Sequence, residues 1–378
     1  MGPAIAAIVT FVFQDKLRNP DMGARMKLHI LTKYSRLGAS SRLRTLQYLP
    51  MLQAEGFELH VAPLFDDAYI QNLYAGRRNP AQILGAYARR MSLAWATRTA
   101  DLIWIEKEAL PWVPWALEKQ LFDKRTPIVT DYDDAIFHNY DLSRNALVRT
   151  LLSTKIDAVM KASALVMAGN PYLAARARRA GAVRVEQVPT VVDSDLYQPS
   201  TDTRHDRPLQ IGWIGTPHTW ARYGLPRMAF FSTLAKDEGV EFLLVGARMQ
   251  PATEGAFTYI PWSEAEEISA IQQMNVGIMP LMDDPWERGK CGYKLIQYMA
   301  CGLPVIASPV GVNVDIVSEG QTGFLADSDA AWRAAIRTLK SDPDRRRAMG
   351  RMGRQRVEQI YSLRAQGPRI AEFLKSLI

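Results

Sequence analysis

Short runs rich in β-branched and aromatic residues alternate along the chain with segments whose apolar residues recur every three or four positions. In the first half the runs lie at residues 27–34, 57–65, 100–108, 126–134 and 164–170, and residues 41–55 have the spacing of an amphipathic helix. In the second half they lie at residues 210–216, 241–247, 257–262, 276–282, 304–310 and 322–326, with helical spacing at residues 264–274 and 293–301. This alternation predicts an α/β fold in which parallel sheets carry helices on both faces.

The pattern also predicts two domains. A polar stretch without periodicity, residues 200–208, separates the two series of strands. A chain of 378 residues exceeds what one hydrophobic core usually organises. We therefore expect an N-terminal domain at residues 26–200 and a C-terminal domain at residues 208–360. Residues 1–25 read as an extension or a loosely attached segment, and residues 361–378 as a terminal helix.

Composition narrows the class of protein. Apolar residues make up 48% and charged residues 22%, which is typical of a globular domain. The two cysteines predict no disulfide framework, and no apolar run approaches the length of a membrane span, so we expect a cytoplasmic protein. Residues 1–190 contain 25 Lys and Arg against 17 Asp and Glu, a balance of +8 that indicates either an anionic partner or ordinary surface charge.

The most informative segment is PWERGKCGYKLIQYMACGLPVIASPVGVN, residues 285–313. Its loop from Gly289 to Gly292 follows a predicted strand and opens a predicted helix, where free backbone N–H groups favour an anion such as phosphate. Lys290 and Lys294 flank the loop and add positive charge, although a solvated lysine face is the alternative for Lys294.

Two more strand-to-helix turns are candidates for ligand contacts. Residues 211–224 place Gly215 and Thr216 between a strand and a helix, as in mononucleotide-binding units, with Arg222 shortly afterwards. Residues 36–46 follow the first strand with a turn of small residues and flanking arginines. Its candidate contacts are Gly38, Ser40, Ser41 and Arg42. Helix capping explains the serines equally well.

Residues 127–138 end a predicted strand with Asp131, Asp133 and Asp134. Carboxyl ends of strands are where open α/β sheets bind ligands. The Asp-Tyr-Asp spacing also has the form of a metal-binding DxD motif, but the phosphate-binding features lie in the other half of the chain. We therefore expect these carboxylates to act in an acceptor or catalytic role without a metal.

The segment from Gln297 onward, QYMACGLPVIASPVGVN, resembles the group 1 (family 4) glycosyltransferases of the GT-B fold. That pattern has one Glu before the glycine-rich loop and a second Glu eight residues later. Here Gly289 and Gln297 stand in those two places, so the resemblance is to a subgroup with a KCxxK loop. In the similar enzymes the first Glu faces the donor sugar and the second holds ribose hydroxyls.

The resemblance implies two Rossmann-like domains facing a cleft, with residues 361–378 crossing back to the N-terminal domain. It implies a retaining, metal-independent transfer of sugar from a nucleoside-diphosphate sugar, without a further cofactor. The implied acceptor is a glycan or lipid-linked molecule, at an anionic membrane surface and without nucleic acid. The alternative is an inactive sugar-nucleotide-binding or scaffold protein of a polysaccharide assembly.

The resulting assignments are as follows. The donor-binding candidates are Gly215, Thr216, Ile260, Trp262, Lys290, Cys291, Gly292, Tyr293 and Gln297. The catalytic candidates are Asp131, Asp133, Arg222 and Lys294, and the acceptor-binding candidates are Gly38, Ser40, Ser41, Arg42 and Asp134.

Overall fold

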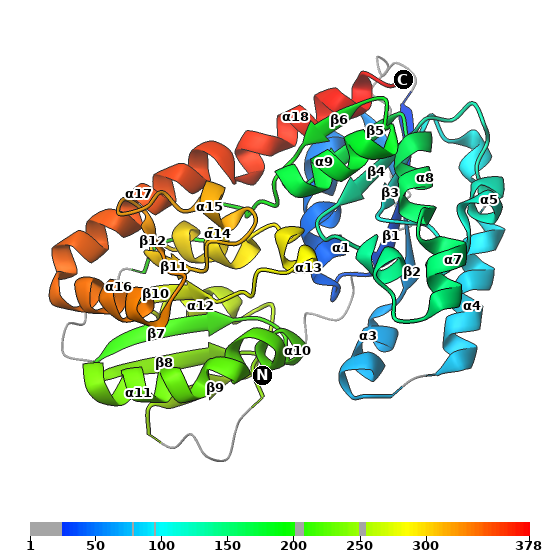
Figure 1. Cartoon of the computed structure of the whole chain (residues 1–378). Helices are drawn as coiled ribbons and strands as arrows, with labels where there is room; N and C mark the ends of the chain where they lie inside the picture. Colours follow the sequence, from blue (N-terminus) through cyan, green and yellow to red (C-terminus); the bar gives the residue numbers. More distant parts are fainter. Residues whose placement is uncertain (1–24, 78, 94–95, 201–207, 249–254) are drawn as a thin grey trace, which may run out of the picture.

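The computed structural model describes residues 25–77, 79–93, 96–200, 208–248 and 255–378. These residues form two α/β domains, each built on a six-stranded parallel sheet (Figure 1). The predicted extension at residues 1–25 and the polar stretch at residues 200–208 lie almost entirely outside the described residues. The α/β class predicted from the strand and helix alternation is confirmed.

The sheet of the N-terminal domain has the order β2-β1-β3-β4-β5-β6. Its strands are β1 (Met26–Tyr34), β2 (Phe57–Phe65), β3 (Leu102–Glu106), β4 (Ile128–Tyr132), β5 (Leu165–Ala168) and β6 (Val185–Gln187). The central strands β3 and β5 are buried at every position, which is why they read as continuous apolar runs.

The sheet of the C-terminal domain has the order β12-β11-β10-β7-β8-β9. Its strands are β7 (Leu209–Ile214), β8 (Val240–Val245), β9 (Phe257–Ile260), β10 (Val276–Met279), β11 (Val305–Ala307) and β12 (Gly323–Leu325). In both sheets the order reverses beside the first strand, and open sheets of this kind bind ligands at the carboxyl ends of their strands.

Helices cover both faces of each sheet. In the N-terminal domain they are α1 (Ala39–Arg44), α2 (Leu49–Ala54), α3 (Asp67–Tyr74), α4 (Pro80–Ser92), α5 (Trp115–Glu118), α6 (His138–Asp141), α7 (Ala146–Leu152), α8 (Lys155–Ala162) and α9 (Pro171–Ala180). The rest are α10 (Pro217–Thr219), α11 (Met228–Glu238), α12 (Glu267–Ile271), α13 (Pro285–Arg288), α14 (Tyr293–Ala300), α15 (Asn313–Ile316), α16 (Asp329–Ser341), α17 (Pro343–Ile360) and α18 (Leu363–Lys375).

Some elements differ from their predicted extents. The single helix expected at residues 41–55 is divided into α1, a 3₁₀ turn and α2, because Pro50 has no N–H to continue a helix and occupies the first turn of α2 instead. The helix expected at residues 264–274 is shortened to α12. The sequence analysis does not predict β6, because its three residues do not form an apolar run.

The last helix belongs to the N-terminal domain in space. Ile370, Ala371 and Leu374 of α18 are buried in one apolar cluster with Leu28 of β1 and Trp104 of β3. α17 instead packs on the C-terminal domain, so the chain passes between the domains a second time near Ser362 (Figure 1).

The two crossings of the chain are bonded to each other. The Val192 N–H donates to the Tyr361 carbonyl over 3.0 Å, and the Leu363 N–H donates to the Val192 carbonyl over 2.9 Å. The two segments of chain that link the domains therefore run side by side at this point. A cavity lies between the two domains. Among the described residues no helix is long and apolar enough to cross a membrane.

Candidate functional site

A cavity of about 750 Å³ lies between the domains. The residues that line it follow strand ends in both sheets: Asp133 follows β4, Gly215 follows β7, Gly246 follows β8, and Met279 ends β10. Because the carboxyl ends of parallel strands meet at one edge of a sheet, the two sheets present these edges to a shared space.

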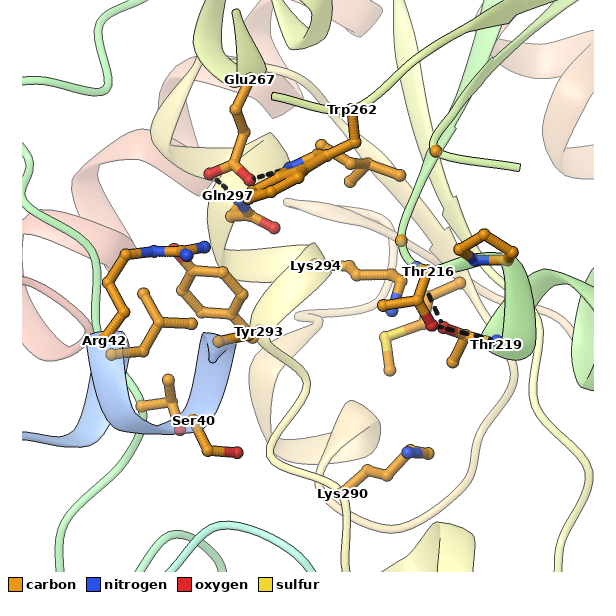
Figure 2. Close-up of a pocket in the computed structure, with 18 of the residues that line it drawn as sticks. Ser40, Arg42, Thr216, Thr219, Trp262, Glu267, Lys290, Tyr293, Lys294 and Gln297 are labelled. Atoms are coloured by element: carbon orange, nitrogen blue, oxygen red, sulfur yellow. Dashed lines mark hydrogen bonds between the residues drawn. The ribbon is translucent and has the colours of Figure 1, made fainter. Parts of the chain in front are cut away.

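All of the donor-binding candidates line this cavity (Figure 2). They are Gly215, Thr216, Ile260, Trp262, Lys290, Cys291, Gly292, Tyr293 and Gln297, and the catalytic candidate Lys294 lines it with them. The hydroxyl of Thr216 accepts from the Thr219 N–H over 3.2 Å and caps α10, so the side chain of Thr216 is already committed.

The loop from Gly289 to Gly292 docks against the N-terminal domain. A Cβ at Gly289 would lie 2.4 Å from the Cβ of Ala135, so only glycine permits this approach. Asn170 donates to the Lys290 carbonyl over 2.9 Å, and the Cys291 thiol donates to the Asp133 carbonyl over 3.2 Å. The place where similar enzymes carry their first Glu is therefore a domain contact here, and a carboxylate side chain has no room.

Gly292 starts helix α14 with a φ of 64°, in the left-handed region that favours glycine. The first turn of α14 then brings Tyr293 and Lys294 to the cavity wall. Helix N-termini attract anions because their N–H groups have no partners within the helix.

Lys294 is the least compensated charge in the cavity. Its ammonium lies 5.6 Å from the centre of the Trp213 ring and has no carboxylate within ion-pair distance among the described residues. Burial, assisted by the charge of Lys290, lowers its pKa to about 8. Lys290 has a weak partner, since its Nζ lies 3.8 Å from Asp134 Oδ1.

The N-terminal wall of the cavity carries a compact ion cluster. Lys107 follows β3 with a φ of 65°, and its Nζ lies 2.8 Å from Asp133 Oδ1 and 3.7 Å from Asp134 Oδ2. It also donates to Ser40 over 2.9 Å. Burial opposes ionisation of Asp133, but Lys107 and Arg44 outweigh it, so the pKa of Asp133 lies below its ordinary value.

Two of the acceptor-site candidates stand behind this wall. Ser41 is fully buried and donates to Glu106 Oε2 over 2.6 Å, so it holds α1 to β3. Gly38 precedes α1 and lies where a Cβ would be 2.3 Å from the Cβ of Tyr34. Ser40, Arg42 and Asp134 do line the cavity.

Asp131 does not reach the cavity. Its carboxylate is 1% exposed and accepts two hydrogen bonds from Arg44, over 2.8 Å and 2.5 Å. The next carboxylate of the Asp-Tyr-Asp spacing, Asp133, is paired with Lys107. The described residues contain no group of three or more His, Cys, Asp or Glu placed to hold a metal ion.

Arg222 also lies off the cavity wall. Its Nε donates to Glu287 Oε1 over 2.7 Å, and Tyr223 donates to the same oxygen over 2.5 Å. Glu287 is fully buried, and a buried carboxylate needs a counter-charge. The arginine assigned to the diphosphate is thus engaged by a carboxylate of α13.

Residues at the opposite end of the cavity from Lys290 include one that the sequence does not single out, Glu267 of α12 (Figure 2). It accepts hydrogen bonds from Trp262 and Gln297. Lys107 is another residue that the sequence analysis does not single out. Its place directly after a buried strand is a signal that could have found it, whereas no local pattern marks Glu267.

Part of the chain matches a known family in sequence. Residues 210–342 match the family described as Glycosyl transferases group 1. A D-inositol 3-phosphate glycosyltransferase of Gordonia bronchialis is 28% identical over 156 residues, 41% of this chain and 30% of that protein. A GDP-mannose-dependent alpha-(1-6)-phosphatidylinositol monomannoside mannosyltransferase of Mycolicibacterium smegmatis is 35% identical over 85 residues, 22% of each chain. These matches span less than a third of either relative.

Solved structures match over nearly the whole chain. HepE of Anabaena, in complex with UDP and glucose, superposes with a TM-score of 0.69 at 18% identity, covering 93% of this chain and 100% of that one. Sucrose-phosphate synthase of Thermosynechococcus elongatus gives a TM-score of 0.67 at 18% identity, covering 93% and 99%. The chain therefore has the GT-B fold, and its residues 210–342 match the group 1 glycosyltransferases in sequence.

Proposed function

We propose that this chain is a retaining glycosyltransferase that moves a sugar from a nucleoside-diphosphate sugar to a glycan or lipid-linked acceptor. The observation that carries the proposal is Lys294, a cation in the cavity without a carboxylate partner among the described residues. Such a cation beside the first turn of α14 favours a dianionic group such as a diphosphate. The group 1 match over residues 210–342 supports the same class of reaction.

In this proposal the two domains divide the work. Lys290, Lys294 and the first turn of α14 stabilise the diphosphate as it leaves, without a bound metal or other cofactor. Ser40, Asp133 and Asp134 face the acceptor from the N-terminal domain. Asp131 and Arg222 have structural roles, because Arg44 and Glu287 already occupy their charged groups.

Calorimetry with UDP, GDP and ADP tests the donor site. Both nucleotides named for similar proteins are included, since HepE was solved with UDP-glucose and one relative is named as GDP-mannose-dependent. Lys294→Ala should weaken the preferred diphosphate about 10- to 100-fold, because one charge-assisted contact is lost. Lys236→Ala, on the exposed face of α11, is the matched control. Unchanged affinity in Lys294→Ala would place the diphosphate elsewhere.

Turnover of a radiolabelled donor separates an enzyme from the alternative, an inactive sugar-nucleotide-binding or scaffold protein. An enzyme releases the diphosphate and labels an acceptor or water, whereas a scaffold binds the donor and leaves it intact. NMR of the product gives the anomeric configuration, which we expect to be retained. We expect activity to survive a chelator; loss with recovery on adding manganese or magnesium would contradict the metal-independent scheme.

We also propose that the protein works in the cytoplasm at an anionic membrane surface. Some of the arginines that contribute to the +8 charge of residues 1–190 already have partners within the protein. Arg90 donates to a buried backbone carbonyl, and Arg176 forms ion pairs with Asp157 and Asp141. Arg78 lies outside the described residues. Arg77, Arg89, Arg178 and Arg179 are exposed.

Helix α7 gives this proposal a particular surface. Leu147 and Leu151 lie one turn apart and are 65% and 62% exposed, and Leu142 just before the helix is 58% exposed. Arg144 and Arg149 are exposed beside them and have no carboxylate partner among the described residues. Exposed leucines flanked by arginines suit the interface of an anionic bilayer.

A further inference from the structure

Lys107 stands behind the cavity wall and is paired with the two aspartates that follow β4. Its backbone has a φ of 65°, a left-handed conformation that a residue other than glycine keeps only where its surroundings hold it. The side chain is 8% exposed, and its Nζ lies 2.8 Å from Asp133 Oδ1 and donates to Ser40 over 2.9 Å. Lys107 therefore neutralises this wall from inside the N-terminal domain.

Asp134 lies between two ammonium groups, one from each domain. Its Oδ2 is 3.7 Å from Lys107 Nζ, and its Oδ1 is 3.8 Å from Lys290 Nζ. These are distances of ion pairs without a hydrogen bond, so neither lysine holds Asp134 tightly. Lys107 is buried and has no other direction to turn. Lys290 lines the cavity, so it can exchange Asp134 for a ligand (Figure 2).

The charges around the start of α14 depend on Lys107 for their sign. The cavity surface here carries Lys290 and Lys294 against Asp133 and Asp134, so these four charges offset one another. Lys107 supplies the fifth charge and makes the local balance positive. Without it, the two lysines of the C-terminal domain would face two aspartates that have lost their partner in the N-terminal domain.

The remaining charged groups near the cavity are of both signs and offset one another. Arg44 pairs with Asp131 behind the wall. Arg42 lies over the Trp262 ring, 5.3 Å from its centre, at the other end of the cavity. The charged groups at that end are the two cations Arg36 and Arg42 and the two anions Glu264 and Glu267. Lys33 and Glu106, next to Lys107, are also of opposite charge.

The pairing of Lys107 with the aspartates persists over the pH range in which Lys294 titrates. Burial alone would lower the pKa of Lys107, but the charges of Asp133, Asp134 and Glu106 raise it above its ordinary value. Burial likewise opposes ionisation of Asp133, and Lys107 and Arg44 outweigh it. Both members of the closest pair are therefore charged at neutral pH.

We propose that Lys107 is a positioning residue that holds Asp133 and Asp134 from behind and thereby keeps Lys290 available to the diphosphate. Lys107 acts through these side chains and does not touch the ligand. The inference rests on the proposed function and adds the residue that decides between an internal carboxylate and the ligand. Once the diphosphate has taken Lys290, Asp134 Oδ1 is free to accept from a hydroxyl of the acceptor.

Calorimetry with UDP, GDP and ADP at pH 7 tests the proposal. Lys107→Met removes the charge and should weaken the preferred diphosphate about fivefold, because Asp134 then pairs with Lys290. Asp134→Asn should bind it about two- to fivefold more tightly than wild type, because Lys290 loses its competitor. The double variant Lys107→Met/Asp134→Asn should return close to the affinity of wild type.

A matched control separates this competition from a simple effect of net charge. Asp101 precedes β3 and Lys107 follows it, so about 16 Å of strand lies between them, beyond the screening length of about 8 Å. Lys107→Met/Asp101→Asn has the same net charge as the first double variant. The asparagine can still accept from the Lys27 N–H, as Asp101 does. This control should bind the diphosphate as weakly as Lys107→Met.

Equal recovery in both double variants would reduce the effect to net charge and overturn the inference. Weaker binding by Asp134→Asn, or unchanged binding by Lys107→Met, would overturn it as well. If Lys107→Met does not fold, Asp134→Asn decides alone, since its side chain is partly exposed and its predicted effect is a gain of affinity. Failure of wild type to bind any of the three diphosphates would instead overturn the proposed function, and this inference with it.

Discussion

A hydrogen atom is the largest side chain that fits at position 289, because the backbone of Ala135 from the other domain lies against it. The glycine therefore acts as a spacer between the domains as well as a turn residue. The cysteine two positions later also contacts the N-terminal domain. Small residues in this loop thus set the width of the cavity as well as the shape of the turn before α14.

Gly289→Ala should destabilise the protein and weaken the domain contact. The added Cβ would meet Ala135 Cβ at 2.4 Å and Ala135 N at 2.7 Å, and overpacking of this kind costs about 1 to 3 kcal/mol. Thermal unfolding measures the loss. Gly85→Ala in α4 is the control, since its nearest neighbour would be 3.7 Å away and the change should be neutral or stabilising. Equal melting temperatures for the two variants would show that the loop does not touch Ala135.

Binding of a nucleoside diphosphate should weaken as the pH rises through about 8. Burial, with the charge of Lys290, lowers the pKa of Lys294 to about 8, so the free protein loses this cation above that pH. The limiting slope is about tenfold per pH unit. The free energy of unfolding has the opposite trend, rising between pH 8 and 10.5, because the unfolded chain holds the proton more tightly there.

Lys294→Arg tests this assignment, since a guanidinium stays charged over the whole range. Calorimetry from pH 7 to 9.5 should give a flatter affinity profile for the arginine variant than for wild type. Profiles that fall in parallel would assign the titration to another group.

The sequence predicted correctly that a residue lines the cavity where the neighbouring residues alone determine its position. Lys294 and Gly292 line the cavity because a strand, a glycine turn and a helix follow one another directly. Arg222 and Asp131 were assigned to ligand contacts, yet each is paired with a buried charge far away in sequence, Glu287 and Arg44. Such pairings depend on tertiary packing, which no local pattern reports.

At the scale of elements, burial explains which parts of the pattern could be recognised. Strands such as β3 and β5 are buried along their whole length and read as apolar runs. β6 is half-buried at the edge of its sheet, so its three residues carry no such signal. α12 has five residues, and the contacts of Glu267 with Trp262 and Gln297 are what give this short helix its place at the cavity.

The start of α18 should depend on one serine. Ser362 is fully buried, and its hydroxyl accepts from the Ala365 N–H over 3.1 Å at the point where the chain crosses between domains. Ser362→Ala should lower the free energy of unfolding by about 1 kcal/mol, the usual cost of losing an N-cap. Ser341→Ala, at the exposed end of α16, should cost far less. Chemical denaturation compares them, and equal midpoints would mean that the cap contributes nothing.

For the whole molecule, the two-domain layout followed from length and from the repeated strand pattern. The position of the cavity, at the carboxyl ends of the strands of both sheets, followed from the predicted parallel arrangement of the strands. The bonded crossings at Val192 and Tyr361 could not be predicted, because each is a single residue of irregular chain.

Membrane association should depend on α7. Liposome flotation at low salt should recover wild type with anionic vesicles and not with neutral ones, and added salt should release it. Leu147→Ser/Leu151→Ser should reduce recovery, since two exposed apolar side chains are lost. Leu196→Ser, a leucine 64% exposed near the crossing, is the matched control. Equal recovery with neutral and anionic vesicles would show that the basic surface is ordinary solvation.

The packing of α18 on the first domain has a consequence for biosynthesis. Ile370, Ala371 and Leu374 complete the apolar cluster around β1 and β3, yet they leave the ribosome after the whole C-terminal domain. Domains usually fold in the order of their synthesis. Here the domain made first must wait, with part of its core open to solvent, until the domain made second has been translated. Chaperones should therefore hold the nascent chain longest at the face that α18 finally covers.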